Sequence, residues 1–106
     1  MSERYLVVPT VSFNEDIERL EEYIIERELA SDTPDDSCIF RFRDALERAM
    51  GILSFAPHTC RRSEEHREFR ELIVPFGNAG CVVLFAIRNV DVVLLAARDQ
   101  HEHDYR

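Results

Sequence analysis

The sequence predicts an α+β domain with the element order β-α-α-β-β-β, in which a helical hairpin packs on a mainly antiparallel sheet. Two amphipathic stretches at helical spacing occupy the first half of the chain, and a short polar segment separates them. Apolar runs of strand length occupy the last third. With 106 residues the chain has the size of one compact domain, so a single domain over residues 1–106 is expected.

The N-terminal part contains one predicted strand and one predicted helix. Residues 5–8 form a short apolar run that Pro9 closes. A surface helix is expected from about Phe13 to Leu29, and Ser12 and Glu15 at its start have the spacing of a capping box. Its apolar stripe comprises Ile17, Leu20, Tyr23, Ile24 and Leu29.

A second helix of similar length is predicted beyond the segment Ser-Asp-Thr-Pro-Asp-Asp. Thr33 and Pro34 suit its N-cap and first position, and Asp36 is an acid for its first turn. Pro57 closes the run. The short loop between the two helices favours an antiparallel hairpin. The apolar stripe of this helix comprises Ile39, Phe42, Leu46, Ala49 and Leu53.

Three further strands are predicted at residues 69–74, 81–88 and 92–97, with turns at Phe-Gly-Asn-Ala-Gly and Arg-Asn-Val-Asp. The last two do not alternate apolar with polar residues, so both of their faces need cover, whereas two helices cover only one face well. Either the polar tail (residues 98–106) and the connector (residues 58–68) fold over the second face, or another polypeptide covers it. That polypeptide would be a homodimer partner or a bound peptide.

The net charge is -8, and every basic side chain is arginine. A net acidic domain is a poor non-specific ligand for nucleic acid, so no direct nucleic-acid partner is expected. No apolar stretch is long enough to cross a bilayer, and the first residues lack the pattern of a signal peptide. We therefore expect a soluble, cytoplasmic protein without a membrane partner.

The cysteines are Cys38, Cys60 and Cys81, an odd number at wide spacing, for which reduced thiols are expected. Cys81 lies in an apolar run and is predicted to be a core residue. Cys60 lies between His58 and His66, but no further pair at recognised spacing completes a zinc site. The sequence thus predicts neither a metal nor a cofactor.

The polar segments carry two groups of side chains with possible chemistry. His101 and His103 are one residue apart, and with Tyr105 they suit an acid/base role, although a solvated tail is the simpler interpretation. The connector region is rich in arginine, at Arg61, Arg62, Arg67 and Arg70. Glutamates are interleaved with these arginines, so mutual neutralisation in salt bridges is expected there. They are Glu64, Glu65, Glu68 and Glu71.

Several strings in the chain occur in a familiar order. They are the first strand ending in Pro9, EDIERLEEYI, SFAPH, HREFRELIVPFGNAGCVVLFAI and LLAARDQHEHDY. Taken together, they resemble toxins of the RelE/ParE superfamily from type II toxin–antitoxin systems, also called plasmid stabilisation proteins. The resemblance covers nearly the whole chain.

This resemblance implies a cytoplasmic toxin that a cognate antitoxin holds inactive by wrapping it with a C-terminal segment. RelE-like members enter the ribosome and cut mRNA, using basic residues on the middle strands together with an arginine and a tyrosine near the C-terminus. ParE-like members lack that set and poison DNA gyrase. The middle-strand positions fall near Ile73, Pro75 and Val82, which are uncharged, so the ParE-like branch is favoured.

On this hypothesis the chain acts by protein binding and has no catalytic residues. The expected surface for gyrase consists of Arg98, Gln100, Glu102 and Tyr105, and Arg62 and Arg70 are expected to contact antitoxin carboxylates. The alternative is a RelE-like, ribosome-dependent endoribonuclease. Its candidate catalytic residues are Arg98, His101, His103 and Tyr105. A third interpretation is an inactive toxin homologue that serves only as a binding module.

Overall fold

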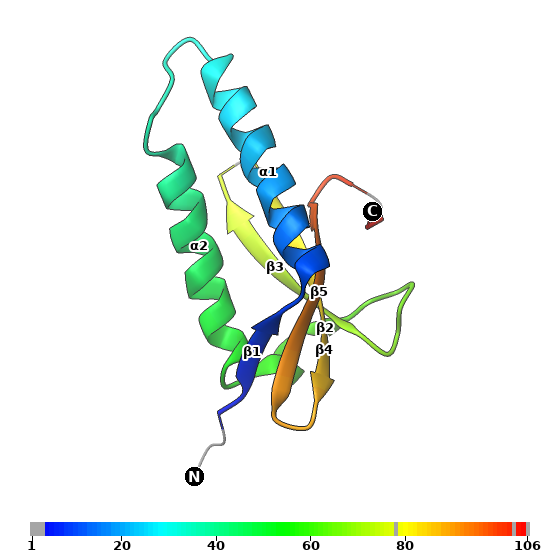
Figure 1. The fold of residues 1–106 in the computed structure, drawn as a ribbon. Coiled ribbons are helices and arrows are strands. Elements are labelled where there is room, and N and C mark those ends of the chain that lie inside the picture. The colour runs from blue at the N-terminus through cyan, green and yellow to red at the C-terminus, as the bar shows by residue number, and fades with distance from the viewer. Residues whose placement is uncertain (1–3, 78, 103, 106) are drawn as a thin grey trace.

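A computed structural model describes residues 4–77, 79–102 and 104–105, and it confirms the predicted α+β fold (Figure 1). The elements are β1 (Leu6–Pro9), α1 (Val11–Leu29), α2 (Cys38–Leu53), a 3-10 turn (Pro57–Thr59), β2 (Arg61–Arg62), β3 (Arg70–Phe76), β4 (Ala79–Arg88) and β5 (Asp91–Asp99). The sheet has the strand order β1-β5-β4-β3-β2. Only β1 pairs in parallel, with β5, and the other pairings are antiparallel. The short strand β2 was not predicted, because the connector carries no apolar run.

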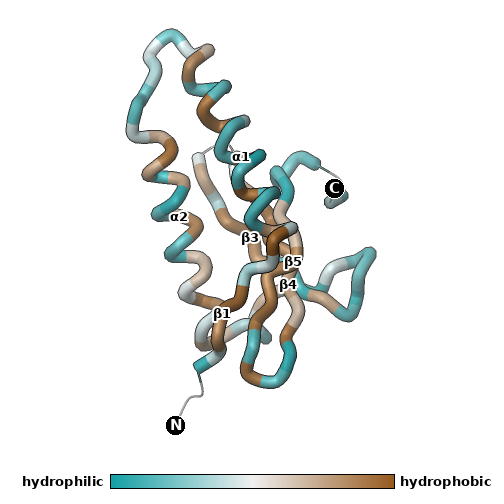
Figure 2. Tube along the Cα trace, in the orientation of Figure 1, coloured by the Kyte–Doolittle hydropathy of each residue, from teal (hydrophilic) through white to brown (hydrophobic). Residues whose placement is uncertain are grey.

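The two helices run antiparallel along one face of the sheet, as expected, and the loop between them lies beyond the end of the sheet (Figure 1). Apolar residues are concentrated in the strands (Figure 2), and the helices contribute Phe13, Leu20, Phe42, Ala49 and Leu53 to the buried core. The largest fully buried side chains include Phe42, Leu53, Val74, Phe85 and Val92. Cys81 is 1% exposed and belongs to this core, which confirms its predicted place. Within the described residues, no helix is both long enough and apolar enough to cross a bilayer.

Helix α1 begins at Val11, and the predicted capping box is wrong. The N-cap is Thr10, whose Oγ1 accepts a 3.2 Å hydrogen bond from the Phe13 amide. The same hydroxyl donates to the Leu94 carbonyl at 2.7 Å, and the Thr10 amide donates to that carbonyl at 3.1 Å. Because Thr10 is fixed on β5 in this way, the helix starts directly after β1 and before Ser12 can serve as a cap.

Helix α2 begins at Cys38, so the predicted start at Thr33 and Pro34 is also wrong. Asp35 accepts hydrogen bonds from the amide and the hydroxyl of Ser37, at 2.9 and 2.7 Å. Its own amide donates to Glu28 Oε1 at 2.7 Å. These local side-chain bonds hold residues 35–37 in a turn, which competes with an earlier helix start.

The hairpin β4–β5 closes at Asn89 and Val90, as the Arg-Asn-Val-Asp string predicts. Asn89 has a φ of 56°, and the turn between β3 and β4 places Gly77 at 55°. In β5 the register shifts by one residue opposite Leu84 and Phe85, which is a β-bulge. The carboxylate of Asp16 in α1 accepts a 2.9 Å hydrogen bond from the Ala97 amide just beyond this shift, and so joins the helix to the sheet.

The sheet face away from the helices is largely closed by the chain itself. On β4, Val82, Leu84 and Ala86 alternate with the core residues, and their exposed fractions are only 3, 6 and 4%. This burial agrees with the interpretation in which the chain covers its own second face. Ile73 on β3 is 48% exposed, so cover by a second polypeptide stays a prediction for the β3 side of this face.

Candidate functional site

A cluster of polar side chains lies on the sheet face away from the helices, with Glu71 of β3 at its centre. Glu71 is 8% exposed. Its Oε1 accepts a 3.0 Å hydrogen bond from Arg61 Nε, and its Oε2 accepts a 2.7 Å hydrogen bond from the Tyr105 hydroxyl. Nη2 of Arg98 lies 3.9 Å from the same Oε2. We call Arg61, Glu71, Arg98 and Tyr105 the Glu71 cluster.

The sheet register brings the cluster together. Arg61 in β2 is the direct partner of Glu71 in β3. Arg98 lies on β5, two strands away, and its partner on the intervening β4 is Val82. The long arginine side chain therefore spans β4 to approach Glu71.

Arg98 is held at several points. Its Nη1 donates to the carbonyl of Glu102 at 2.7 Å and to that of Asp99 at 3.2 Å. Its guanidinium carbon lies 5.3 Å from the centre of the Tyr105 ring, a cation–π distance. Its Nε is buried and has no hydrogen-bond partner within the described part of the chain. The guanidinium is thus held by the tail and by Glu71 together.

The environment of Tyr105 keeps its phenol protonated. Burial raises the pKa of the hydroxyl well above its ordinary value, and the hydrogen bond to Glu71 and the charge of that carboxylate raise it further. The positive charge of Arg98 opposes this effect but does not outweigh it. At neutral pH, Tyr105 is therefore a hydrogen-bond donor and not a base.

A cavity of about 420 Å³ opens beside the cluster, between the connector and the C-terminal tail. Arg62 and His66 line it from the connector, and Asp104 and Tyr105 line it from the tail. Both signs of charge are present in its walls, so the cavity is a mixed polar site and not a concentrated basic one.

The residues predicted for the gyrase surface divide between two places. Arg98 and Tyr105 meet in the Glu71 cluster, whereas Glu102 lines a separate hollow beside α1 together with His101. Glu102 accepts the Asp99 amide at 3.0 Å through Oε1, which fixes the turn after β5. Gln100 and His101 are exposed. His103 lies outside the described residues.

The two arginines predicted for antitoxin contacts differ in role. Arg62 is exposed, lines the cavity, and donates to the Arg67 carbonyl at 3.1 Å. Arg70 donates to the carbonyls of Cys60 and His58, at 2.7 and 3.3 Å. Arg70 thus ties the connector to β3, and its guanidinium is engaged within the chain.

Sequence reasoning did not single out Glu71 or Arg61 as site residues. It did predict that glutamates neutralise the arginines of the connector, and the Arg61–Glu71 ion pair confirms this in one instance. The available signal was a glutamate inside a predicted strand, since a carboxylate on a half-buried sheet needs partners.

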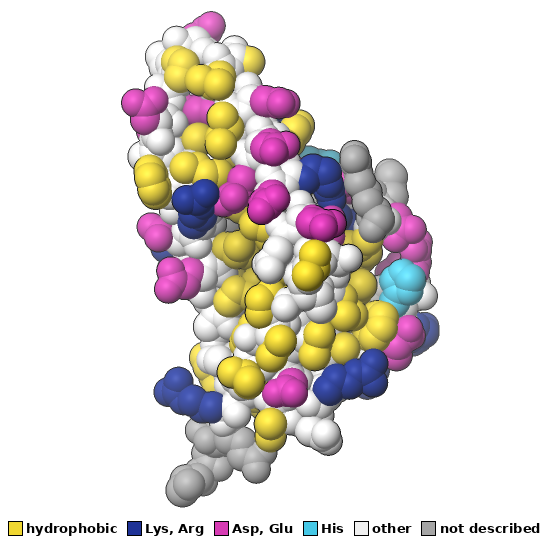
Figure 3. Space-filling model, viewed as in Figure 1, with side chains coloured by type: hydrophobic (Ala, Val, Ile, Leu, Met, Phe, Trp, Pro, Cys, Tyr) yellow, Lys and Arg dark blue, Asp and Glu magenta, His cyan; other side chains and the backbone are white. Residues whose placement is uncertain are grey.

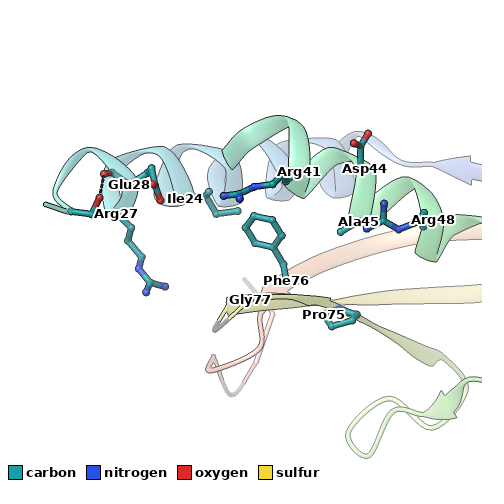
Figure 4. A pocket seen from close by; sticks show the side chains of 11 residues that line it. Ile24, Arg27, Glu28, Arg41, Asp44, Ala45, Arg48, Pro75, Phe76 and Gly77 are labelled. Atoms are coloured by element: carbon teal, nitrogen blue, oxygen red, sulfur yellow. Dashed lines mark hydrogen bonds between the residues drawn. The ribbon is translucent and has the colours of Figure 1, made fainter. Parts of the chain in front are cut away.

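A second candidate surface is a groove of about 640 Å³ between α1, α2 and the end of β3, which we call the helix groove (Figure 4). Phe76 points from β3 toward the helices and contacts Phe42 edge to face, with ring centres 5.5 Å apart. The groove combines apolar side chains with three arginines and two acids. Its lining includes Ile24, Ala45, Phe76, Arg27, Arg41, Arg48, Glu28 and Asp44.

No family model matches the chain, and no curated protein matches its sequence.

Proposed function

We propose that the chain is the toxin of a type II toxin–antitoxin module, that it acts like ParE by binding DNA gyrase in the cytoplasm, and that a cognate antitoxin neutralises it. The Glu71 cluster carries this proposal. Arg98 and Tyr105, the residues that the family resemblance assigns to the active end of the toxin, are both engaged with an internal carboxylate. A guanidinium whose charge is already paired with a carboxylate offers less stabilisation to a scissile phosphate than a free one, which favours binding over phosphoryl transfer.

The centre of the sheet supports the same choice. Cleavage of RNA requires cations around the scissile phosphate and a group that activates the 2′-hydroxyl. Ile73 and Val82 are direct partners across β3 and β4, and Pro75 faces Gly80 on the same pair of strands. These positions offer no charge, and the protonated Tyr105 offers no base.

The helix groove supports the proposed antitoxin partner. Its lining combines apolar side chains with three arginines and two acids, so its charged lining groups carry a net positive charge, which suits an amphipathic segment with acidic groups bound as a helix in a groove. Hydrophobic side chains are exposed over the helical hairpin (Figure 3). The large ones on α1 and α2 include Tyr23, Ile25, Leu29 and Phe40. An antitoxin segment on this surface would remove apolar area from water.

One observation favours the enzymatic alternative, a RelE-like endoribonuclease. Arg61, His66, Arg98 and Tyr105 line a single cavity, and Glu71 lines it as well. A carboxylate, an imidazole and two guanidinium groups form a set that supports proton transfer beside a phosphate. In this alternative His66 is the acid/base imidazole, the role for which the sequence pointed to His101 and His103.

Production of the chain alone in a bacterial host tests the proposal, together with a supercoiling assay on purified gyrase. We expect growth arrest, filamentous cells, induction of the DNA-damage response and inhibition of supercoiling by the purified chain. Arg98→Ala is expected to abolish these effects, whereas Arg88→Ala, an exposed arginine at the β4–β5 hairpin, is the matched control.

Three results would contradict the proposal in different ways. Codon-specific cuts in toeprints of translating ribosomes would identify the endoribonuclease. Normal growth together with unaffected gyrase would leave an inactive homologue that works as a binding module. Arrest that persists in the Arg98→Ala variant would remove the Glu71 cluster from the active surface.

A further inference from the structure

Two carboxylates and one imidazole converge where the connector meets the C-terminal tail. Glu65 and His66 come from the connector and Asp104 from the tail, and one ligand atom of each lies within 4.8 Å of the other two. We propose that these three residues bind a divalent transition-metal ion of the Zn²⁺ class, which joins the connector to the tail. This inference does not depend on toxin activity.

The spacing of the three groups fits an ion between them. No ion pair or hydrogen bond joins the His66 ring to either carboxylate, so the three groups approach one another without bonding directly. Zinc binds imidazole nitrogen and carboxylate oxygen at about 2.0–2.2 Å, which places its ligand atoms roughly 3–4 Å apart. Small side-chain movements are therefore enough to bring the three ligand atoms, which lie within 4.8 Å of one another, onto one ion.

The charges of the site also call for a cation. Glu65 makes no ion pair with any described residue, and Asp104 accepts only the Tyr105 amide, at 2.8 Å, through Oδ1. The arginines of the same cavity form no ion pair with either carboxylate, since Arg61 pairs with Glu71 and Arg62 donates to the Arg67 carbonyl. Two carboxylates that meet in a chain of net charge -8 repel each other, and a divalent ion offsets that repulsion.

The backbone holds His66 in place. Its amide donates to Ser63 Oγ at 3.2 Å, and its carbonyl accepts the Phe69 amide at 2.8 Å. The ring lies 6.3 Å from that of Phe69, is half-buried, and makes no hydrogen bond within the described residues. Ser63 is itself 3% exposed, so this turn is anchored. The backbone of His66 is therefore fixed, and both ring nitrogens are free of hydrogen bonds to the described residues.

The tail is held on the opposite side of the site. Tyr105 directly follows Asp104 and bonds to Glu71, so the position of Asp104 depends on the Glu71 cluster. An ion shared by Asp104, Glu65 and His66 would fix the tail at a second point and close the mouth of the cavity. Three protein ligands leave further coordination positions open to water.

The site is tested by titrating the metal-free chain of 106 residues with Zn²⁺. Calorimetry and NMR of the histidine rings monitor the titration. We expect one equivalent to bind, with shifts in the His66 ring. Asp104→Asn and His66→Gln are each expected to weaken binding by about 10-fold or more. Glu64→Gln and the double variant His101→Gln/His103→Gln are controls on the same two segments, and they are expected to retain the wild-type affinity within about 2-fold.

Thermal unfolding separates a lost ligand from a lost fold. In the absence of metal, the Asp104→Asn and His66→Gln variants are expected to melt close to the wild type, and only their Zn²⁺-dependent rise in melting temperature is expected to vanish. The proposal is overturned if the wild type does not bind Zn²⁺. It is also overturned if binding survives Asp104→Asn and disappears in the His101→Gln/His103→Gln variant, which would indicate an adventitious ion on the tail histidines.

Discussion

The hydroxyl of Tyr105 donates a 2.7 Å hydrogen bond to Oε2 of Glu71 and thereby ties the end of the chain to the middle of the sheet. Tyr105→Phe removes this donor and leaves a buried carboxylate oxygen without its closest partner. We expect a loss of about 1–2 kcal/mol in the free energy of unfolding, measured in urea. Faster proteolysis of the tail is expected as well. Tyr23→Phe, which alters an exposed phenol, is the control, and an equal loss there would contradict the role of the hydrogen bond.

Removal of the Glu71 carboxylate is expected to lower the free energy of unfolding by more than Tyr105→Phe does. Glu71→Gln keeps the shape of the side chain but leaves Arg98, whose side chain is 12% exposed, without its counter-charge. We expect a destabilisation of about 2–3 kcal/mol, at or below the lower end of the range for breaking a buried pair, because the Arg61 side chain is 53% exposed. Denaturant unfolding of Glu71→Gln beside Glu68→Gln, an exposed glutamate of the connector, checks this expectation.

Alkaline pH is expected to weaken the fold through Tyr105. The pKa of this phenol is raised in the folded chain above its ordinary value of 10.0, so the folded state retains a proton that the unfolded state loses. The resulting stability is present in full below about pH 10 and is lost as the pH rises from there toward the folded-state pKa. Unfolding curves between pH 8 and 11.5 should show a steeper decline for the wild type than for Tyr105→Phe. Parallel curves would contradict this explanation.

The capping-box spacing predicts Ser12 as the N-cap of the first helix, whereas the N-cap of α1 is Thr10, and two alanine variants distinguish these two caps. Thr10→Ala removes the cap and the bond to Leu94, and it is expected to cost about 1–2 kcal/mol. Ser12→Ala removes the residue of the predicted capping box and is expected to change stability by less than about 0.5 kcal/mol. Thermal denaturation of both variants is the measurement. A larger effect at Ser12 would restore the capping box.

Cys60 and Cys81 are expected to react in a fixed order. Burial raises the pKa of the Cys60 thiol, and it raises that of Cys81 to about 12, with the charge of Asp99 adding to the effect. Thiolate is the reactive form, so labelling at pH 8 should modify half-buried Cys60 slowly and Cys81 only after unfolding. Mass spectrometry of the labelled peptides measures the order. Labelling of native Cys81 at the rate of Cys60 would contradict it.

The elements of this fold follow from local patterns, whereas their limits and the site do not. Apolar spacing was sufficient to predict both helices and the three long strands, because each stripe must face a core. The start of α1 depends on Leu94, a residue distant in sequence, and no local pattern records that contact. Likewise, Arg98 and Glu71 meet only across the width of β4, so the register of three strands was needed to bring them together.

The parallel pairing of β1 with β5 joins two segments that lie far apart in the sequence, since Leu6 aligns with Asp91 and Pro9 with Leu94. During synthesis β1 can pair with β5 only after β5 has left the ribosome, so this edge of the sheet forms late. Until then the nascent helical hairpin exposes its apolar sides. The edge of the sheet and the site residue Arg98 on β5 are therefore completed at the same stage of synthesis.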